Sequence, residues 1–211
     1  MKYSSWMLQG IRIDLDNMRE YSGELSELIE GTKDAFSKKV DERAESMSVE
    51  SRDGWYDWNA DRHWRLRDVF PSLLHNSLFI AIYSYLESTL GNLARKMERS
   101  NPQDVAMEDI EESVIDRYRK YLKEVQGIDF PDQSREWQRI RTYQKIRNFI
   151  VHNGGRVDDC HKHAKCIRNF IEQNSDLVLI DQDQVYVSRQ GNLDFLDTLD
   201  SFFESLFENI D

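Results

Sequence analysis

Arg147, Asn148 and His152 are the residues whose types and spacing best fit a chemical role in this 211-residue chain. They stand in the run QKIRNFIVHNGG, residues 144–155, which ends in a glycine pair. On a helix, residues 148 and 152 share one face, and Arg147 lies one residue from that face. A frayed last turn can therefore bring a guanidinium, an amide and an imidazole together at one helix end.

These three groups fit the handling of a phosphodiester. An arginine presents a rigid fork of donors that suits a phosphate and stays protonated at any working pH. An imidazole takes and returns a proton near neutral pH. RNA carries its own nucleophile, the 2′-hydroxyl, so a base and a phosphate clamp suffice for cleavage to a 2′,3′-cyclic phosphate. The residues predict a ribonuclease site that needs neither metal nor cofactor.

The spacing alone carries little information, and its context carries more. With 18 Arg and five His in the chain, roughly 0.4 matches to Arg, four residues, His are expected by chance. Arg156 and His161 repeat the spacing without an Asn or a helical apolar stripe. At the first site the Asn, the apolar residues 149–151 and the glycine pair coincide with a basic lead-in, which comprises Arg135, Arg139, Arg141 and Lys145.

On these residues the chain resembles the HEPN family (higher eukaryote and prokaryote nucleotide-binding), whose active members carry Arg, four to six residues, then His. Arg147, Asn148 and His152 match that motif one by one. The resemblance covers about residues 7–155, but only the motif is specific to the family, and the rest matches as a pattern of helices. It implies a helical ribonuclease that works as a homodimer, often as a toxin or abortive-infection effector. Some relatives are partnered by an antitoxin that modifies a Tyr two residues after the His, where this chain has Gly154.

The resemblance assigns roles to the motif and to a residue of an earlier helix. His152 is expected to act as general base or acid at the 2′-hydroxyl, Arg147 to bind the scissile phosphate and Asn148 to orient it. Glu87 is the candidate for the polar residue that approaches the pair. The basic residues expected to bind substrate are Lys145, Arg141 and Arg139.

Plainer explanations exist for each residue. His152 can cap carbonyls at a helix C-terminus, Arg147 can pair with a carboxylate, and Glu87 can be a surface acid on a helix flank. The chain can then be a catalytically inactive HEPN-like module that uses the same basic face to bind nucleotide, RNA or a partner protein. A third reading is a structural interaction protein built around the acidic C-terminal helix.

Apolar periodicity predicts the elements that position the motif. We expect a mainly α protein, a HEPN-like helical bundle with a small β-hairpin insertion and an amphipathic C-terminal helix. One domain, 1–211, is expected to have its core at about 7–155 and an extension at 156–211. The predicted helices cover about 5–47, 71–97, 110–122, 134–152 and 192–210, and the hairpin covers 177–188. Pro71 is expected to open the second helix and Asn192 to cap the last. The long first helix can serve as a packing wall or as a dimer arm.

Residues 50–64 interrupt the helical pattern at Asp53-Gly54 and are rich in aromatic side chains. We expect a loop there. Its aromatic residues, interleaved with Arg, can stack unpaired bases or fold over the core as a lid. The aromatic residues are Trp55, Tyr56, Trp58 and Trp64.

The composition indicates a cytoplasmic protein without a membrane span. The net charge is −11, which argues against a general nucleic-acid coating protein. The longest apolar region, 73–93, is interrupted by polar residues, and no signal peptide opens the chain. On a helix Cys160, His163 and Cys166 fall near one face, but their spacing is wrong for a zinc finger, so no metal is expected.

Overall fold

The structure, a computed structural model, describes residues 3–156, 164–181, 184–208 and 210. The helices are α1 (Tyr3–Glu45), α2 (Val49–Trp64), α3 (Phe70–Ser100), α4 (Val114–Lys120), α5 (Arg135–His152), α6 (Ala164–Gln173) and α7 (Arg189–Glu208). Short turns of 3₁₀ or π type are η1 (Arg65–Val69), η2 (Met107–Asp109) and η3 (Tyr121–Val125), and the strands are β1 (Val178–Asp181) and β2 (Gln184–Val187). The mainly α class is confirmed, and the described residues contain the expected β-hairpin.

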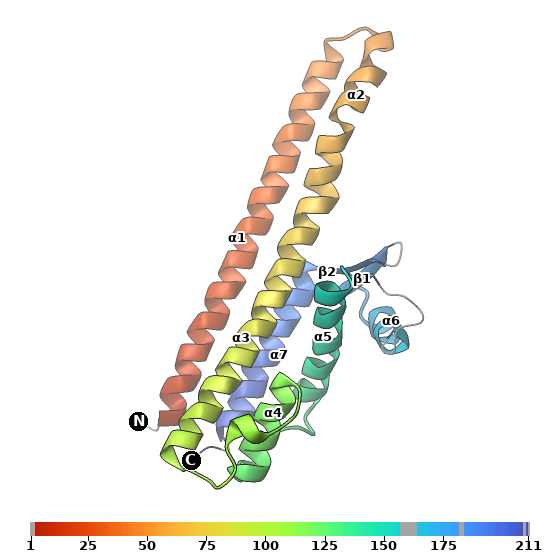
Figure 1. The fold of residues 1–211 in the computed structure, drawn as a ribbon. Coiled ribbons are helices and arrows are strands. Elements are labelled where there is room, and N and C mark those ends of the chain that lie inside the picture. The colour runs from red at the N-terminus through yellow and green to blue at the C-terminus, as the bar shows by residue number, and fades with distance from the viewer. Residues whose placement is uncertain (1–2, 157–163, 182–183, 209, 211) are drawn as a thin grey trace.

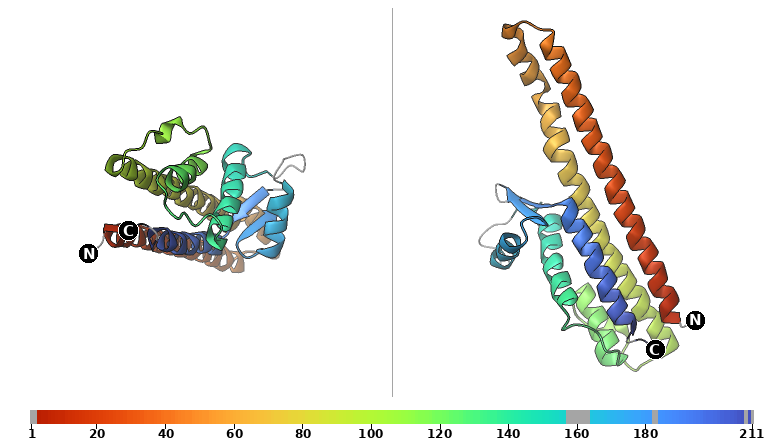
Figure 2. Two further views of the ribbon diagram at one scale, coloured as in Figure 1. Left: turned by 90° about the horizontal axis from the view of Figure 1, so that it is seen from below. Right: turned by 180° about the vertical axis from the view of Figure 1, so that it is seen from behind.

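A long helical hairpin dominates the shape. α1 runs antiparallel to α2 and α3, and the far end of this hairpin projects well beyond the other helices as an arm (Figures 1 and 2). At the opposite end α7 packs against α1, α3 and α5. One apolar core joins these helices with the hairpin strands. Its large side chains with no measurable exposure include Phe79, Tyr143, Phe195, Phe202 and Phe203.

The expected loop at residues 50–64 is wrong, because this segment is α2. Gly54 lies inside the helix and does not end it. A glycine in a helix interior costs about 1 kcal/mol, which packing against a second helix can offset. The Trp55 side chain supplies such a contact, since its Nε1 donates to the carbonyl oxygen of Val40 in α1 at 3.0 Å.

The second helix does not begin at Pro71. α2, η1 and α3 form one continuous helix, Val49–Ser100, and Pro71 lies just after a π turn. Proline lacks the N–H that an α-helix interior needs, and a π turn changes the local hydrogen-bond pattern. Here the Phe70 N–H donates to the Arg65 carbonyl, and the Ser72 hydroxyl donates to the Asp68 carbonyl at 2.6 Å. The chain therefore stays helical through Pro71, directly after this local change of hydrogen-bond pattern.

The ends of two other helices also differ from expectation. α4 begins at Val114, and its helical turn continues through η3 to Val125. α7 begins at Arg189, because Ser188 is the capping residue: its Oγ accepts from the Gly191 N–H at 2.9 Å. Asn192 is buried instead, and its amide donates to the His75 carbonyl at 3.0 Å.

The C-terminal segment belongs to the same core as the rest of the chain. β1 and β2 pair antiparallel with Val178 opposite Val187 and Ile180 opposite Val185. Buried residues of α6, β2 and α7, together with Leu177 and Val178, share the apolar core with residues of α1, α3 and α5. The segment is therefore integrated with the helices before residue 155 and does not form a separate appendage.

One helix within the described ranges passes a test of length and composition for crossing a membrane. It is Val49–Ser100, which is long enough and has an apolar stretch of 18 residues. A core helix of a soluble protein passes the same test. Because the α3 part of this helix packs against α1, α5 and α7, the finding is only weak support for a span.

Candidate functional site

The motif lies in the last turns of α5, as the sequence predicts. Ser134 caps the helix, since its hydroxyl accepts from the Trp137 N–H at 3.1 Å. The buried stripe that holds α5 in the bundle comprises Trp137, Ile140, Tyr143, Ile146 and Phe149. Local sequence therefore fixes both the start of this helix and the face that it buries.

Two glycines with positive φ end α5 and connect it to the hairpin. Gly154 has φ 58° and Gly155 has φ 81°, a region that favours glycine. The Gly155 N–H donates to the Phe149 carbonyl at 2.9 Å, in the manner of a helix C-cap. The Gly155 carbonyl in turn accepts from the Val185 N–H of β2 at 2.9 Å. The helix end that carries His152 is thus tied to a strand.

Arg147 is half-buried against α3. Its Cζ lies 5.3 Å from the centroid of the Tyr83 ring, within cation–π range. Its Nη1 donates to Oδ1 of Asn148 at 3.1 Å. Its Nε is buried and has no hydrogen-bond partner among the described residues. Within the described residues this Nε donor is therefore left unsatisfied.

Glu87, which lies on α3 one turn after Tyr83, is near Arg147 of α5. Burial raises the pKa of the Glu87 carboxyl, and the positive charge of Arg147 opposes part of that rise. Arg139 and Arg141 of the same helix each contact a carboxylate directly, at 2.6 Å and 2.7 Å. Within the described residues, Arg147 and Glu87 form no such ion pair. Glu87 thus shares the electrostatic environment of Arg147 without neutralising it by direct contact.

Tyr83 was not among the expected site residues, although it lies on the same face of α3 as Glu87. Burial raises the pKa of its phenol, with the charge of Glu87 as the next cause. Its hydroxyl has no hydrogen-bond partner of good geometry among the described residues, although the Gln144 amide is near enough to influence that pKa. The signal in the sequence is its four-residue spacing from Glu87.

Asn148 and His152 are exposed on the last turns of α5. Asn148 contacts Arg147 as described above, whereas His152 makes no hydrogen bond to Arg147, Asn148 or Glu87 within the described structure. The structure therefore brings together Arg147, Asn148 and the neighbourhood of Glu87, and leaves the imidazole facing solvent beside them.

The three basic residues expected to bind substrate have different surroundings. Arg139 forms a two-point ion pair with Asp194 of α7, with Nε to Oδ2 at 2.6 Å and Nη2 to Oδ1 at 2.9 Å. Arg141 contacts Oδ1 of Asp116 at 2.7 Å. Lys145 approaches the Cys166 sulfur at 3.4 Å and remains on the surface. Arg139 and Arg141 therefore hold helices together, and Lys145 is the member of the set best placed to meet a ligand.

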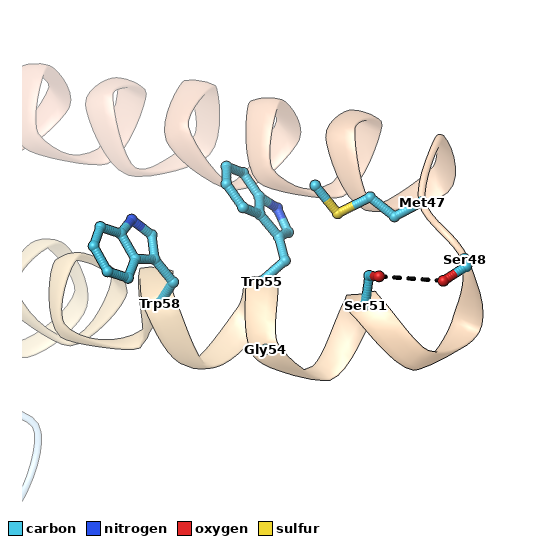
Figure 3. A pocket seen from close by; sticks show the side chains of 6 residues that line it. All are labelled: Met47, Ser48, Ser51, Gly54, Trp55 and Trp58. Carbon is cyan, nitrogen blue, oxygen red and sulfur yellow. Dashed lines mark hydrogen bonds between the residues drawn. The ribbon is translucent and has the colours of Figure 1, made fainter.

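The aromatic segment of α2 lies at the far end of the arm, away from the motif (Figure 1). Trp58 is 82% exposed, so the expected lid over the core is wrong. Figure 3 shows a shallow pocket at the tip, with Trp55 turned toward α1 and Trp58 farther along α2. Its lining residues are Met47, Ser48, Ser51, Gly54, Trp55 and Trp58. Any base stacking there would occur at a distance from Arg147.

No cluster of metal-binding side chains is found within residues 3–156, 164–181 and 184–208. Cys166 belongs to the predicted face of two cysteines and one histidine. Its side chain is exposed and its thiol is free. Cys160 and His163 lie outside the described residues.

Comparison with known proteins finds no family model, no curated protein and no solved structure that matches this chain.

Proposed function

We propose that this chain is a HEPN-like, metal-independent endoribonuclease that acts as a toxin or abortive-infection effector. The observation that carries the proposal is the environment of Arg147. The guanidinium is held over Tyr83, and its buried Nε has no partner among the described residues. Because the Arg147 side chain as a whole is only half-buried, its permanently charged fork can still present a positive charge to a phosphate oxygen.

The proposed reaction uses only groups of RNA and of this site. His152 takes the proton of the 2′-hydroxyl, whose oxygen attacks the adjacent phosphorus. The bond from phosphorus to the 5′-oxygen breaks, and the protonated imidazole of His152 gives its proton to that leaving oxygen. The product ends are a 2′,3′-cyclic phosphate and a 5′-hydroxyl. Arg147 stabilises the charge on the phosphorane oxygens, and Asn148 holds the guanidinium in its orientation.

Glu87 has a supporting part in this proposal. Its carboxylate lies close enough to influence Arg147 electrostatically. A negative charge there helps to keep the guanidinium at the α3–α5 contact without occupying its donors. Lys145, which is on the surface one turn before Asn148, adds positive charge toward the RNA backbone.

The test is RNA cleavage in EDTA by the purified chain, with mapping of the ends produced. We expect cleavage with 2′,3′-cyclic phosphate ends that Arg147→Ala and His152→Ala each lower by at least about 100-fold. The chain contains a matched control, since Arg156 and His161 have the same spacing. Arg156→Ala and His161→Ala are expected to cleave RNA as the wild type does.

A second candidate function rests on the exposed His152, which no described residue orients. In this alternative the chain is an inactive HEPN-like module that binds nucleotide, RNA or a partner protein through Arg147 and Lys145. Intact RNA with the folded wild type, together with RNA binding that survives His152→Ala and is lost in Arg147→Ala, would establish the module and exclude the nuclease.

A further inference from the structure

The outer face of α1 carries four large apolar side chains that are exposed to solvent. Trp6 is 67% exposed, Ile13 52%, Tyr21 54% and Leu28 65%. With 3.6 residues per turn, these positions fall within one narrow stripe that is about 33 Å long. The opposite face of α1 contains buried residues such as Leu15 and packs against the bundle. An exposed apolar row of this length on a helix surface indicates a contact surface for another molecule.

The spacing of the stripe is symmetric about Asn17. Trp6 and Leu28 each lie 11 residues from Asn17, and Ile13 and Tyr21 each lie four residues from it. Asn17 is itself exposed on the same face. When two such helices pair antiparallel about a two-fold axis beside Asn17, every large apolar residue meets another. Symmetric contacts of this kind are the commonest in homodimers.

We propose that a second copy of this chain docks on the stripe, with the two α1 helices antiparallel. Trp6 then lies opposite Leu28 of the partner subunit, and Ile13 opposite Tyr21 of the partner subunit. Asn17 faces its own equivalent at the axis. A polar residue at one central position of an apolar seam selects the register of a helix pair.

The direction of pairing follows from two further residues of the stripe, Glu24 and Gly10. A parallel pair would set Glu24 against its own equivalent, and like charges across a seam repel. In the antiparallel pair Glu24 lies opposite Gly10, seven residues to the other side of Asn17. No heavy atom approaches within 4 Å of the place where a Cβ on Gly10 would stand, so there is room for the longer side chain. The antiparallel arrangement is therefore favoured.

The rest of α1 is anchored to its own bundle. Arg12 contacts Asp200 at 2.9 Å, and Arg19 contacts Asp197 at 2.9 Å, both on α7. These ion pairs hold α1 at a fixed rotation, so the stripe faces outward. A rigid, preformed face loses little conformational entropy when it binds.

This contact is separate from the candidate ribonuclease site. α1 packs against α2, α3 and α7, whereas α5 packs against α3, α6, α7 and β2 (Figure 1). The stripe contains none of the proposed site residues. A single helix pair is smaller than the standard interface of about 800 Å² per partner, so we expect a dissociation constant in the micromolar range.

The test measures the mass of the full chain by sedimentation at about 100 µM, well above a micromolar dissociation constant. We expect the wild type to be a dimer, and Ile13→Lys and Tyr21→Glu each to weaken it at least about tenfold. The double variant should recover most of the affinity, because each Lys then faces a Glu across the axis. In a parallel pair the two new like charges would repel their own equivalents, and the double variant would be the weakest.

Leu73→Lys is the matched control, since Leu73 is 60% exposed but lies on α3. It should dimerise as the wild type does, and circular dichroism should show all variants equally helical. The proposal is overturned by a wild type that stays monomeric, by single variants that dimerise normally, or by a double variant no better than either single one.

Discussion

The guanidinium of Arg147 lies over the ring of Tyr83, with Cζ 5.3 Å from the ring centroid. The contact joins the last turns of α5 to the middle of α3 and places a cation on an aromatic face. Because the Tyr83 hydroxyl is buried without a well-oriented partner in the described structure, the ring rather than the hydroxyl supports Arg147.

Tyr83→Phe is therefore expected to leave the free energy of unfolding unchanged or to raise it by up to about 1 kcal/mol, since it removes an unsatisfied buried hydroxyl. Tyr83→Leu loses the aromatic face as well and should destabilise the chain by about 1–2 kcal/mol. Urea denaturation at pH 7 compares the two. A loss above about 2 kcal/mol in Tyr83→Phe would show that the hydroxyl is satisfied after all.

Glu87 gives a pH-dependent prediction. Its pKa is raised in the folded chain by burial, with Arg147 opposing. A carboxyl with a raised folded pKa adds stability below its unfolded pKa, and this contribution is lost as the pH rises through the folded value. Glu87→Gln should therefore be more stable than the wild type at pH 7 by up to about 1 kcal/mol. Near pH 4 the difference in the free energy of unfolding should disappear. Urea denaturation of both proteins at pH 7 and at pH 4 measures it.

The matched experiment on Glu87 uses Arg147. In an Arg147→Ala background no guanidinium offsets the cost of the buried carboxylate, so the gain from Glu87→Gln at pH 7 should be larger. An equal gain in both backgrounds would mean that the two charges do not interact, and it would remove Glu87 from the proposed site.

Arg139 is predicted to contribute mainly to stability. Its two-point pair with Asp194 joins α5 to α7, and the two side chains are only 18% and 28% exposed. Arg139→Ala leaves that carboxylate with fewer donors and should lower the free energy of unfolding by about 2 kcal/mol. Arg135→Ala, an exposed position one turn earlier, should change it by less than about 0.5 kcal/mol. Similar losses in the two variants would contradict a structural role for the pair.

Alanine substitutions at Gly154 and Gly155, the glycine pair after α5, distinguish the cost of backbone strain from the cost of steric crowding. Alanine at either glycine is strained by the positive φ, at about 1–2 kcal/mol. Gly154 has open space where a Cβ would stand, whereas a Cβ on Gly155 would lie 2.6 Å from Nε2 of Gln184. Thermal denaturation should therefore show a larger loss for Gly155→Ala than for Gly154→Ala. A reversed order would mean that the hairpin yields easily at this contact.

Local sequence was sufficient to predict the motif helix. The apolar stripe from Trp137 to Phe149, the Ser134 cap and the glycine pair each act through residues within a few positions of one another. The same holds for the first helix and for the paired strands. These features depend on short-range sterics and hydrogen bonds, which periodicity and residue type report directly.

Predictions failed where a distant contact decided the outcome. Gly54 lies in a helix because α2 packs along α1, and Asn192 is buried beside His75 of α3. In both cases the residue's local preference is worth about 1 kcal/mol, so tertiary packing overrides it.

The sequence by itself determined which residues stand at the end of α5, and therefore that Arg147, Asn148 and His152 share one helix end. Only the tertiary structure decided their partners: Tyr83 and Glu87 beside Arg147, and Asp194 on Arg139. These partners lie on other helices, and which side chains meet depends on the rotation and offset of two packed helices. Ridges and grooves along the whole contact set that relationship, and no short stretch of sequence encodes it.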